Sequence, residues 1–161
     1  MEPRTTFSTP RFSRWPRTIS EKSPERAKAL GVEFVGLDDL LKTADVVSIH
    51  VKLTEQSKGL IGKRELGLMR PGAILVNTAR GAIVDATALV SALKSGHLGG
   101  AALDVFEEEP LPANHPILSC EQVVLTPHNA DQTPEGMELL NAGVVDNVIA
   151  FLEGRPENVV N

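Results

Sequence analysis

Three short stretches of this sequence carry side chains that can bind an acid or move a proton. "NTARG" (77–81) contains Arg80, whose guanidinium can hold a carboxylate through two parallel hydrogen bonds. "TPH" (126–128) ends in His128, and histidine can give or take a proton near neutral pH. "DVFEEEP" (104–110) carries an aspartate and three consecutive glutamates. Together they indicate a polar site that binds an acid and transfers a proton.

The three glutamates of the last stretch need not share one role. A carboxylate close to His128 would orient the imidazole and favour its charged form. Glu107, Glu108 and Glu109 are all candidates, because their spacing alone does not choose between them. Glu109 has one local distinction, since Pro110 follows it and restricts its backbone toward extended conformations. The alternative is a solvated acidic loop with no specific role.

From Ser23 onward, helical signals alternate with short apolar strands. Strands are expected at 32–35, 45–50, 73–78, 99–105 and 122–126, and helices from Ser23 and at 37–44, 63–72, 85–96 and 133–153. This alternation predicts an α/β fold with a mostly parallel sheet and helices on both faces. Ligands of such sheets bind outside the carboxyl ends of the strands.

Polar residues follow each of the later strands. They are His50 after the strand at 45–50, Thr78, Ala79 and Arg80 after 73–78, Asp104 and the glutamates after 99–105, and His128 after 122–126. Because the carboxyl ends of parallel strands meet at one edge of a sheet, we expect these residues to form one site.

The amino-acid composition and net charge limit which kinds of protein this chain can be. The 161 residues suffice for one domain with a core, and 42% hydrophobic and 23% charged residues are ordinary for a globular protein. A net charge of −5 gives no reason to expect a nucleic-acid partner. No metal ion is expected either. The single cysteine, Cys120, favours a reducing compartment, and the apolar runs are too short for a membrane span or a secretory signal. A cytoplasmic location is therefore predicted.

The charge is uneven along the chain. Residues 1–28 hold seven basic and three acidic residues, and the first 22 are rich in Ser, Thr, Pro and Arg. We expect 1–22 to be a disordered basic arm, 23–154 a folded domain and 155–161 a C-terminal tail. A basic arm that binds a polyanion is the alternative for the first segment.

The motifs at 77–81, 104–110 and 126–128 occur in the order and at the spacing of a known family. The chain from about Ser23 to Asn161 resembles the D-isomer-specific 2-hydroxyacid dehydrogenases, the phosphoglycerate dehydrogenase-like group. The resemblance implies that 23–154 is a partial, Rossmann-like NAD-binding domain, and that the activity is NAD-dependent hydride transfer between a 2-hydroxy acid and its 2-keto acid. NADP is an alternative cofactor, and a homodimer is implied.

The resemblance also implies roles for individual residues. Arg80 would bind the substrate, His128 would be the acid/base, and Glu109, rather than Glu107 or Glu108, would pair with His128. The implied cofactor contacts are His50, Val51, Thr78, Ala79, Arg80, Asp104 and His128.

The sequence departs from the family pattern in several places. No G-x-G-x-x-G turn occurs, so the sheet is expected to be incomplete, without the first strand and the glycine loop that cradles the pyrophosphate. Lys52 stands where the family often has proline, and Asn129 and Ala130 replace an apolar residue and glycine. The alternatives to an enzyme are a truncated remnant that binds nucleotide weakly or dimerises, and a regulatory module with a basic arm. The apolar C-terminal helix predicts self-association or an added partner.

Overall fold

A computed structural model describes residues 25, 28 and 34–159 of the chain. The chain divides into two compact units, one ending at His128 and one beginning at Asn129. Most of the helix predicted from Ser23, and the first half of the strand predicted at 32–35, lie outside the described residues. Phe34 and Val35 are not in a strand; the chain passes through Gly36, the N-cap, directly into helix α2.

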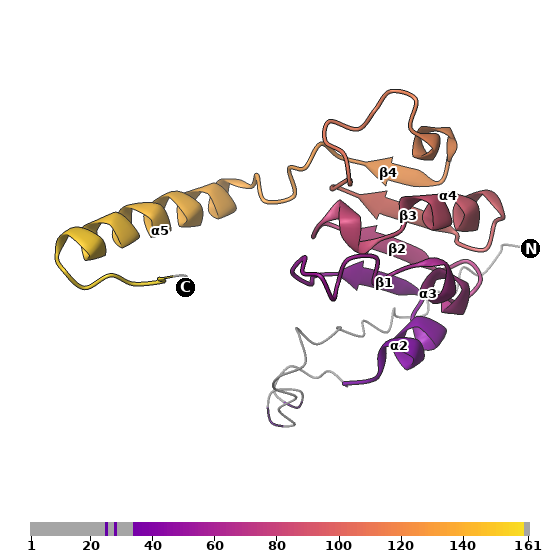
Figure 1. Ribbon diagram of the computed structural model, residues 1–161, viewed down its shortest axis with the longest axis horizontal. Helices are drawn as coiled ribbons and strands as arrows, with labels where there is room; N and C mark the ends of the chain where they lie inside the picture. The colour runs from indigo at the N-terminus through magenta and orange to yellow at the C-terminus, as the bar shows by residue number, and fades with distance from the viewer. Residues whose placement is uncertain (1–24, 26–27, 29–33, 160–161) are drawn as a thin grey trace, which may run out of the picture. The chain divides into compact units, whose positions relative to one another are not determined.

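The first unit is built on a four-stranded parallel sheet with the order β1-β2-β3-β4 (Figure 1). Its strands are β1 (Val46–Ile49), β2 (Ile74–Asn77), β3 (Gly100–Leu103) and β4 (Val123–Leu125). The register pairs Ile49 with Asn77 and Asn77 with Leu103. The strands therefore end side by side, which places the segments that follow them at one edge.

Helices α2 (Leu37–Thr43), α3 (Lys63–Leu68) and α4 (Ala86–Lys94) alternate with the strands, and two short 3-10 helices, η1 (Gly81–Ile83) and η2 (Pro116–Ser119), complete the unit. Asp85 caps α4, because its carboxylate accepts from the backbone N–H of Ala88 at 2.9 Å. Each predicted helix within the described residues is present, although most are shorter than the sequence pattern suggested.

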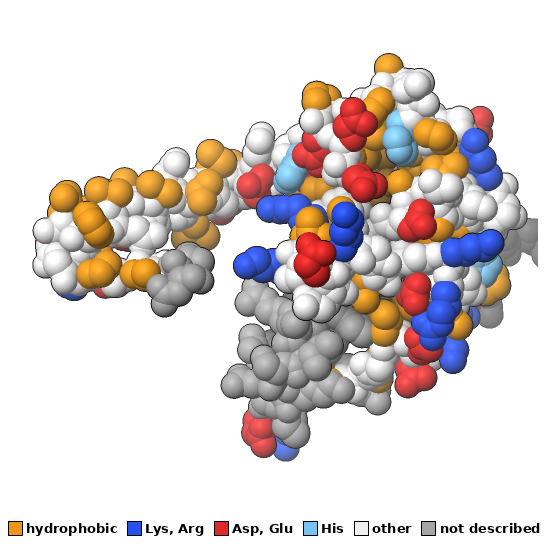
Figure 2. Space-filling view, in the orientation of Figure 1, with side chains coloured by type: hydrophobic (Ala, Val, Ile, Leu, Met, Phe, Trp, Pro, Cys, Tyr) orange, Lys and Arg blue, Asp and Glu red, His pale blue; other side chains and the backbone are white. Residues whose placement is uncertain are grey.

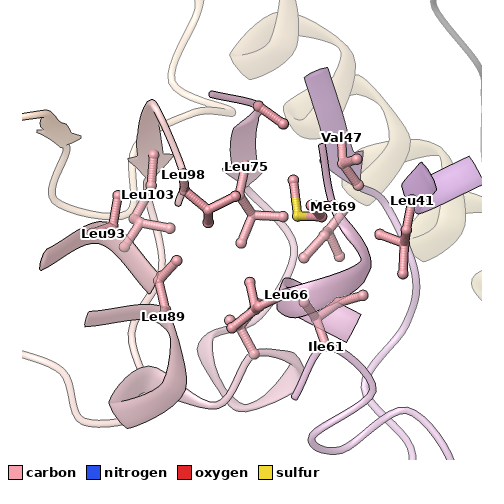
Figure 3. Packing of buried hydrophobic residues seen from close by; sticks show 14 of the residues in the cluster. Leu41, Val47, Ile61, Leu66, Met69, Leu75, Leu89, Leu93, Leu98 and Leu103 are labelled. Carbon is pink, nitrogen blue, oxygen red and sulfur yellow. The ribbon is translucent and has the colours of Figure 1, made fainter. Parts of the chain in front are cut away.

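The core lies between these helices and one face of the sheet. Alternate strand residues such as Val47, Leu75 and Leu103 point into it and meet Leu66 and Leu93 from the helices (Figure 3). The opposite face is less covered, with Ile74 41% and Val124 64% exposed. The parallel Rossmann-like α/β fold is confirmed, whereas the expected covering by helices is met on one face only in this described part of the chain.

The second unit contains helix α5 (Pro134–Leu152). Thr133 caps it, because its hydroxyl accepts from Gly136 N–H at 3.0 Å. Apolar side chains along the helix are exposed, among them Leu139, Phe151 and Leu152. No helix within the described residues is long and apolar enough to cross a membrane.

Candidate functional site

The turn that presents Arg80 is built by Asn77, the last residue of β2. Asn77 is 1% exposed, and both ends of its amide are used. Its Nδ2 donates to the carbonyl of Arg80 at 2.9 Å, and its Oδ1 accepts from the N–H of Ala79 at 3.0 Å. The side-chain amide of Asn77 thus gives both backbone groups a hydrogen-bond partner, and it fixes the three-residue turn that carries Arg80.

Gly81 brings this turn against the segment that carries the glutamates. A Cβ placed on Gly81 would lie 2.0 Å from the carbonyl carbon of Phe106 and 2.3 Å from the nitrogen of Glu107. Only glycine allows two backbones to approach so closely. The Arg80 turn and the 104–110 segment are therefore held as one unit.

Glu109 is the glutamate of the run that contacts His128. Its Oε2 lies 2.8 Å from His128 Nδ1, and its Oε1 accepts from the backbone N–H of Phe106 at 2.8 Å. The hydrogen bond from His128, and then that from Phe106, lower the pKa of the Glu109 carboxyl. The carboxylate is thus ionised over a wider pH range, and it holds the ring by Nδ1 so that Nε2 is free to exchange a proton.

His128 adopts an uncommon backbone conformation. Its φ is 55°, in the left-handed region that costs a residue with a Cβ roughly 1–2 kcal/mol. Such strain persists where the surroundings impose it, and it collects at functional sites. Just before it, Thr126 donates its hydroxyl to the carboxylate of Asp104, which is 3% exposed, and this bond ties β4 to the end of β3.

Arg80 differs from the other arginines of the described residues in its charge environment. Arg64, Arg70 and Arg155 each form an ion pair with a carboxylate. Arg80 forms none with the residues that the structure describes, and among these its Nη1 donates to the carbonyl of Ala79 at 2.6 Å. Its charge still contributes to the lowered pKa of Glu109. A guanidinium kept close to the His128–Glu109 pair and left without a carboxylate is suited to an acidic ligand.

A pocket of about 490 Å³ opens beside Arg80 at the ends of β1 and β2. It is lined by His50, Val51, Lys52, Leu53, Thr78, Ala79 and Arg80, with no acidic residue among them. Figure 2 shows Lys, Arg and His side chains gathered at the side of the first unit toward which the strands of Figure 1 point. A second pocket of about 210 Å³ lies under the Gly81–Phe106 contact and is mainly apolar, so it is a poorer place for polar chemistry.

The lining of the larger pocket fits part of a dinucleotide. It is concave, lies at the carboxyl ends of parallel strands and is positively charged, as a phosphate-bearing ligand requires. His50, Val51, Thr78, Ala79 and Arg80 would line the cofactor, while the glycine loop that would hold the pyrophosphate is not in this sequence.

The structure brings most of the predicted site residues to this edge in two groups. His50, Val51, Thr78, Ala79 and Arg80 line the larger pocket, and Glu109 and His128 form the adjoining pair. Asp104 is buried at the end of β3 and is not among the pocket's lining residues, so its contact with a cofactor stays a prediction.

Sequence reasoning missed two residues that build the site, Asn77 and Gly81. The tendency of asparagine to bond its own backbone two residues on was the signal available for Asn77.

A parallel sheet with a positively charged pocket and a hydrogen-bonded His–Glu pair at its carboxyl edge matches the place where nucleotide-binding α/β domains hold their ligands. Comparison with known families agrees with this class. The family described as D-isomer specific 2-hydroxyacid dehydrogenase, NAD binding domain, matches residues 15–130, and the chain belongs to this family.

Individual relatives support the assignment. A glyoxylate reductase from Aeropyrum pernix is 51% identical over 138 residues, which cover 85% of this chain and 41% of the relative. A D-3-phosphoglycerate dehydrogenase from Archaeoglobus fulgidus is 44% identical over 142 residues, or 86% of this chain and 27% of the relative. The solved structure of NAD-dependent formate dehydrogenase from Staphylococcus aureus in complex with NAD has a TM-score of 0.73 and 36% identity, covering 81% of this chain and 40% of that one. The chain thus spans less than half the length of these relatives.

Proposed function

We propose that this chain is the catalytic half of an NAD-dependent 2-hydroxyacid dehydrogenase that interconverts a 2-keto acid and its 2-hydroxy acid. The observation that carries the proposal is that Arg80, which forms no ion pair with the described residues, acts electrostatically on the carboxylate of Glu109, which is bonded to His128. The names of the relatives make glyoxylate a suitable first substrate to test. NADP is the alternative cofactor.

Each residue of the site has a distinct role in this proposal. Arg80 binds the substrate carboxylate and stabilises negative charge on the carbonyl oxygen. His128 donates a proton to that oxygen from Nε2 during reduction and takes it back during oxidation. Glu109 keeps the ring oriented by its bond to Nδ1. His50, Val51, Thr78 and Ala79 position the cofactor, which supplies the hydride when bound.

The proposal is tested by mixing the purified chain with NADH and glyoxylate and following the loss of NADH absorbance. Turnover that is lost in Arg80→Gln and His128→Asn, and kept in the neighbouring Glu108→Gln control, supports an enzyme. Turnover that is unchanged in Arg80→Gln would overturn the assignment of the site.

A second candidate function is a domain that binds nucleotide weakly, or dimerises, without catalysis. The observation that favours it is the absence of a G-x-G-x-x-G turn from the sequence, since this turn normally holds the pyrophosphate. Binding of NADH without turnover in the same assay would select this candidate. No binding at millimolar NADH would exclude both.

We further propose a homodimer in the cytoplasm. The support for self-association is the row of exposed apolar side chains on α5, including Val144, Val148 and Phe151. Sedimentation of the chain should show a dimer that dissociates when Val148 is replaced by aspartate, whereas a monomer at all concentrations would contradict the proposal. The low cysteine content supports the location.

A further inference from the structure

We infer that Lys52 is a second anion-binding residue of the larger pocket, so that the pocket takes a ligand with two anionic groups, one held by Arg80 and one by Lys52. This inference rests on the proposed function and extends it to the charge of the ligand. It assigns a role in specificity to a residue that stands outside the three motifs.

The first support is the position of Lys52 relative to Arg80. Ile49 and Asn77 are paired in the register of β1 and β2, and Lys52 and Arg80 each stand three residues further along the chain. Both line the same pocket, together with His50, and no carboxylate lines it to neutralise them. Two positively charged side chains that face one pocket without acidic partners repel each other, and an anion bound between them offsets this repulsion.

The second support is that the backbone of Lys52 is fixed by a buried serine. Ser57, 9% exposed, donates its hydroxyl to the carbonyl of Lys52 at 2.7 Å. The same hydroxyl accepts from the N–H of Thr54 at 2.8 Å. These two bonds fix the backbone from which the Lys52 side chain extends.

The third support is that the Lys52 loop is tied to the Arg80 turn. The N–H of Gly59 donates to the carbonyl of Ala82 at 2.9 Å, and that of Ile61 donates to Ile83 at 3.0 Å. The segment that follows Lys52 is therefore fastened to the segment that follows Arg80. The backbones that carry the two cations are thus fixed relative to each other, which lowers the cost of binding an anion between them.

The anionic group that Lys52 would hold is an oxyanion, and it has two possible sources. It is a phosphate of the cofactor, or a second acidic group on the substrate. A cofactor phosphate makes Lys52 important for NADH itself, whereas a substrate group makes it important only for a 2-keto acid with two carboxylates.

The test is a calorimetric titration of the whole chain with three probes. NADH is titrated alone, and 2-oxobutyrate (one carboxylate) and 2-oxoglutarate (two carboxylates) are titrated at saturating NAD⁺, which cannot reduce them. The variants are Lys52→Ala, Arg80→Gln and the control Lys58→Ala, which removes an exposed lysine of the same loop that does not line the pocket. Because Lys52 is exposed, its loss should weaken the affected probe by roughly five- to tenfold.

The outcomes separate the two sources and the two proposals. Weaker NADH binding in Lys52→Ala, but not in Lys58→Ala, supports the inference with a cofactor phosphate. Weaker 2-oxoglutarate binding with unchanged 2-oxobutyrate binding supports it with a substrate group. Unchanged binding of all probes in Lys52→Ala, alongside a loss in Arg80→Gln, overturns the inference and leaves the proposed function standing. No binding of any probe to the unaltered chain overturns both.

Discussion

Replacing Gly81 by alanine tests whether the Arg80 turn and the glutamate segment are held together by close backbone contact. The added Cβ would meet the Phe106 carbonyl carbon at 2.0 Å, where ordinary contacts begin at 3.4 Å. Phe106 and Glu107 would have to move away by more than an ångström. Because the opposing atoms are backbone, no side chain can rotate to relieve the clash.

The cost follows from this geometry. Overpacking in a well-packed site costs typically about 1–3 kcal/mol, and a clash between two backbones belongs at the upper end, so we expect Gly81→Ala to lower the free energy of unfolding by about 3 kcal/mol. Part of the effect should reach the acid/base pair, because the N–H of Phe106 donates to Glu109. The pKa of Glu109 should then rise toward its ordinary value.

The assay is urea denaturation of the purified chain, with the unfolding free energy taken from the linear dependence on urea. Gly67→Ala is the matched control, because Gly67 lies in α3 with no atom within 4 Å of the added Cβ. There the change should stabilise by up to about 1 kcal/mol, since alanine favours helix more than glycine does. A change of less than about 0.5 kcal/mol in Gly81→Ala would refute the reasoning.

Three further predictions concern the site and its supports. In His128→Asn the pKa of Glu109 should rise, because the main hydrogen bond that lowers it is lost, and carbon-detected NMR titration would show this. Since the Glu109 pKa is depressed in the folded state, the stability that the pair contributes should disappear as pH falls through that pKa. If the unaltered chain and the variant lose stability equally in acid, the pair contributes none. Asn77→Ala should lower the free energy of unfolding by about 2 kcal/mol in urea, because it removes the partner of the Ala79 N–H and leaves the Arg80 carbonyl with only the 3.3 Å bond from the Ile83 N–H. Glu107→Gln and Glu108→Gln should change the unfolding free energy by less than about 0.5 kcal/mol, and a large effect in either would show that the acidic run acts as a whole.

The fold was largely predictable because the strands are short, apolar and separated by helical patterns. Alternation of "DVVSIH" and "AILVNT" with helical segments was enough to predict the parallel sheet, and the register then brings the strand ends together. The ends of the helices were less predictable. Helix α3 stops at Leu68, several residues before the Pro71–Gly72 stop signal, because the last turn gives way to the loop that enters β2.

The site was predictable in its residue types but not in its contacts. Chemistry alone left Glu107, Glu108 and Glu109 equivalent, and the family resemblance singled out Glu109; in the structure Glu109 is the one that reaches His128. Such a choice depends on which carboxylate the loop turns inward, and spacing does not determine that. The close approach at Gly81 depends on a segment 25 residues away, so no local pattern could reveal it.

The central claim is that Arg80, Glu109 and His128 form one site for a 2-keto acid beside a bound nicotinamide cofactor. It is tested most directly by calorimetric titration of oxamate, an unreactive analogue of a 2-keto acid, into the chain at saturating NADH. We predict binding that requires NADH and weakens by roughly tenfold or more in Arg80→Gln, because a charge-assisted pair is lost. Oxamate binding that is absent from the unaltered chain, or that is the same in Arg80→Gln, would contradict it.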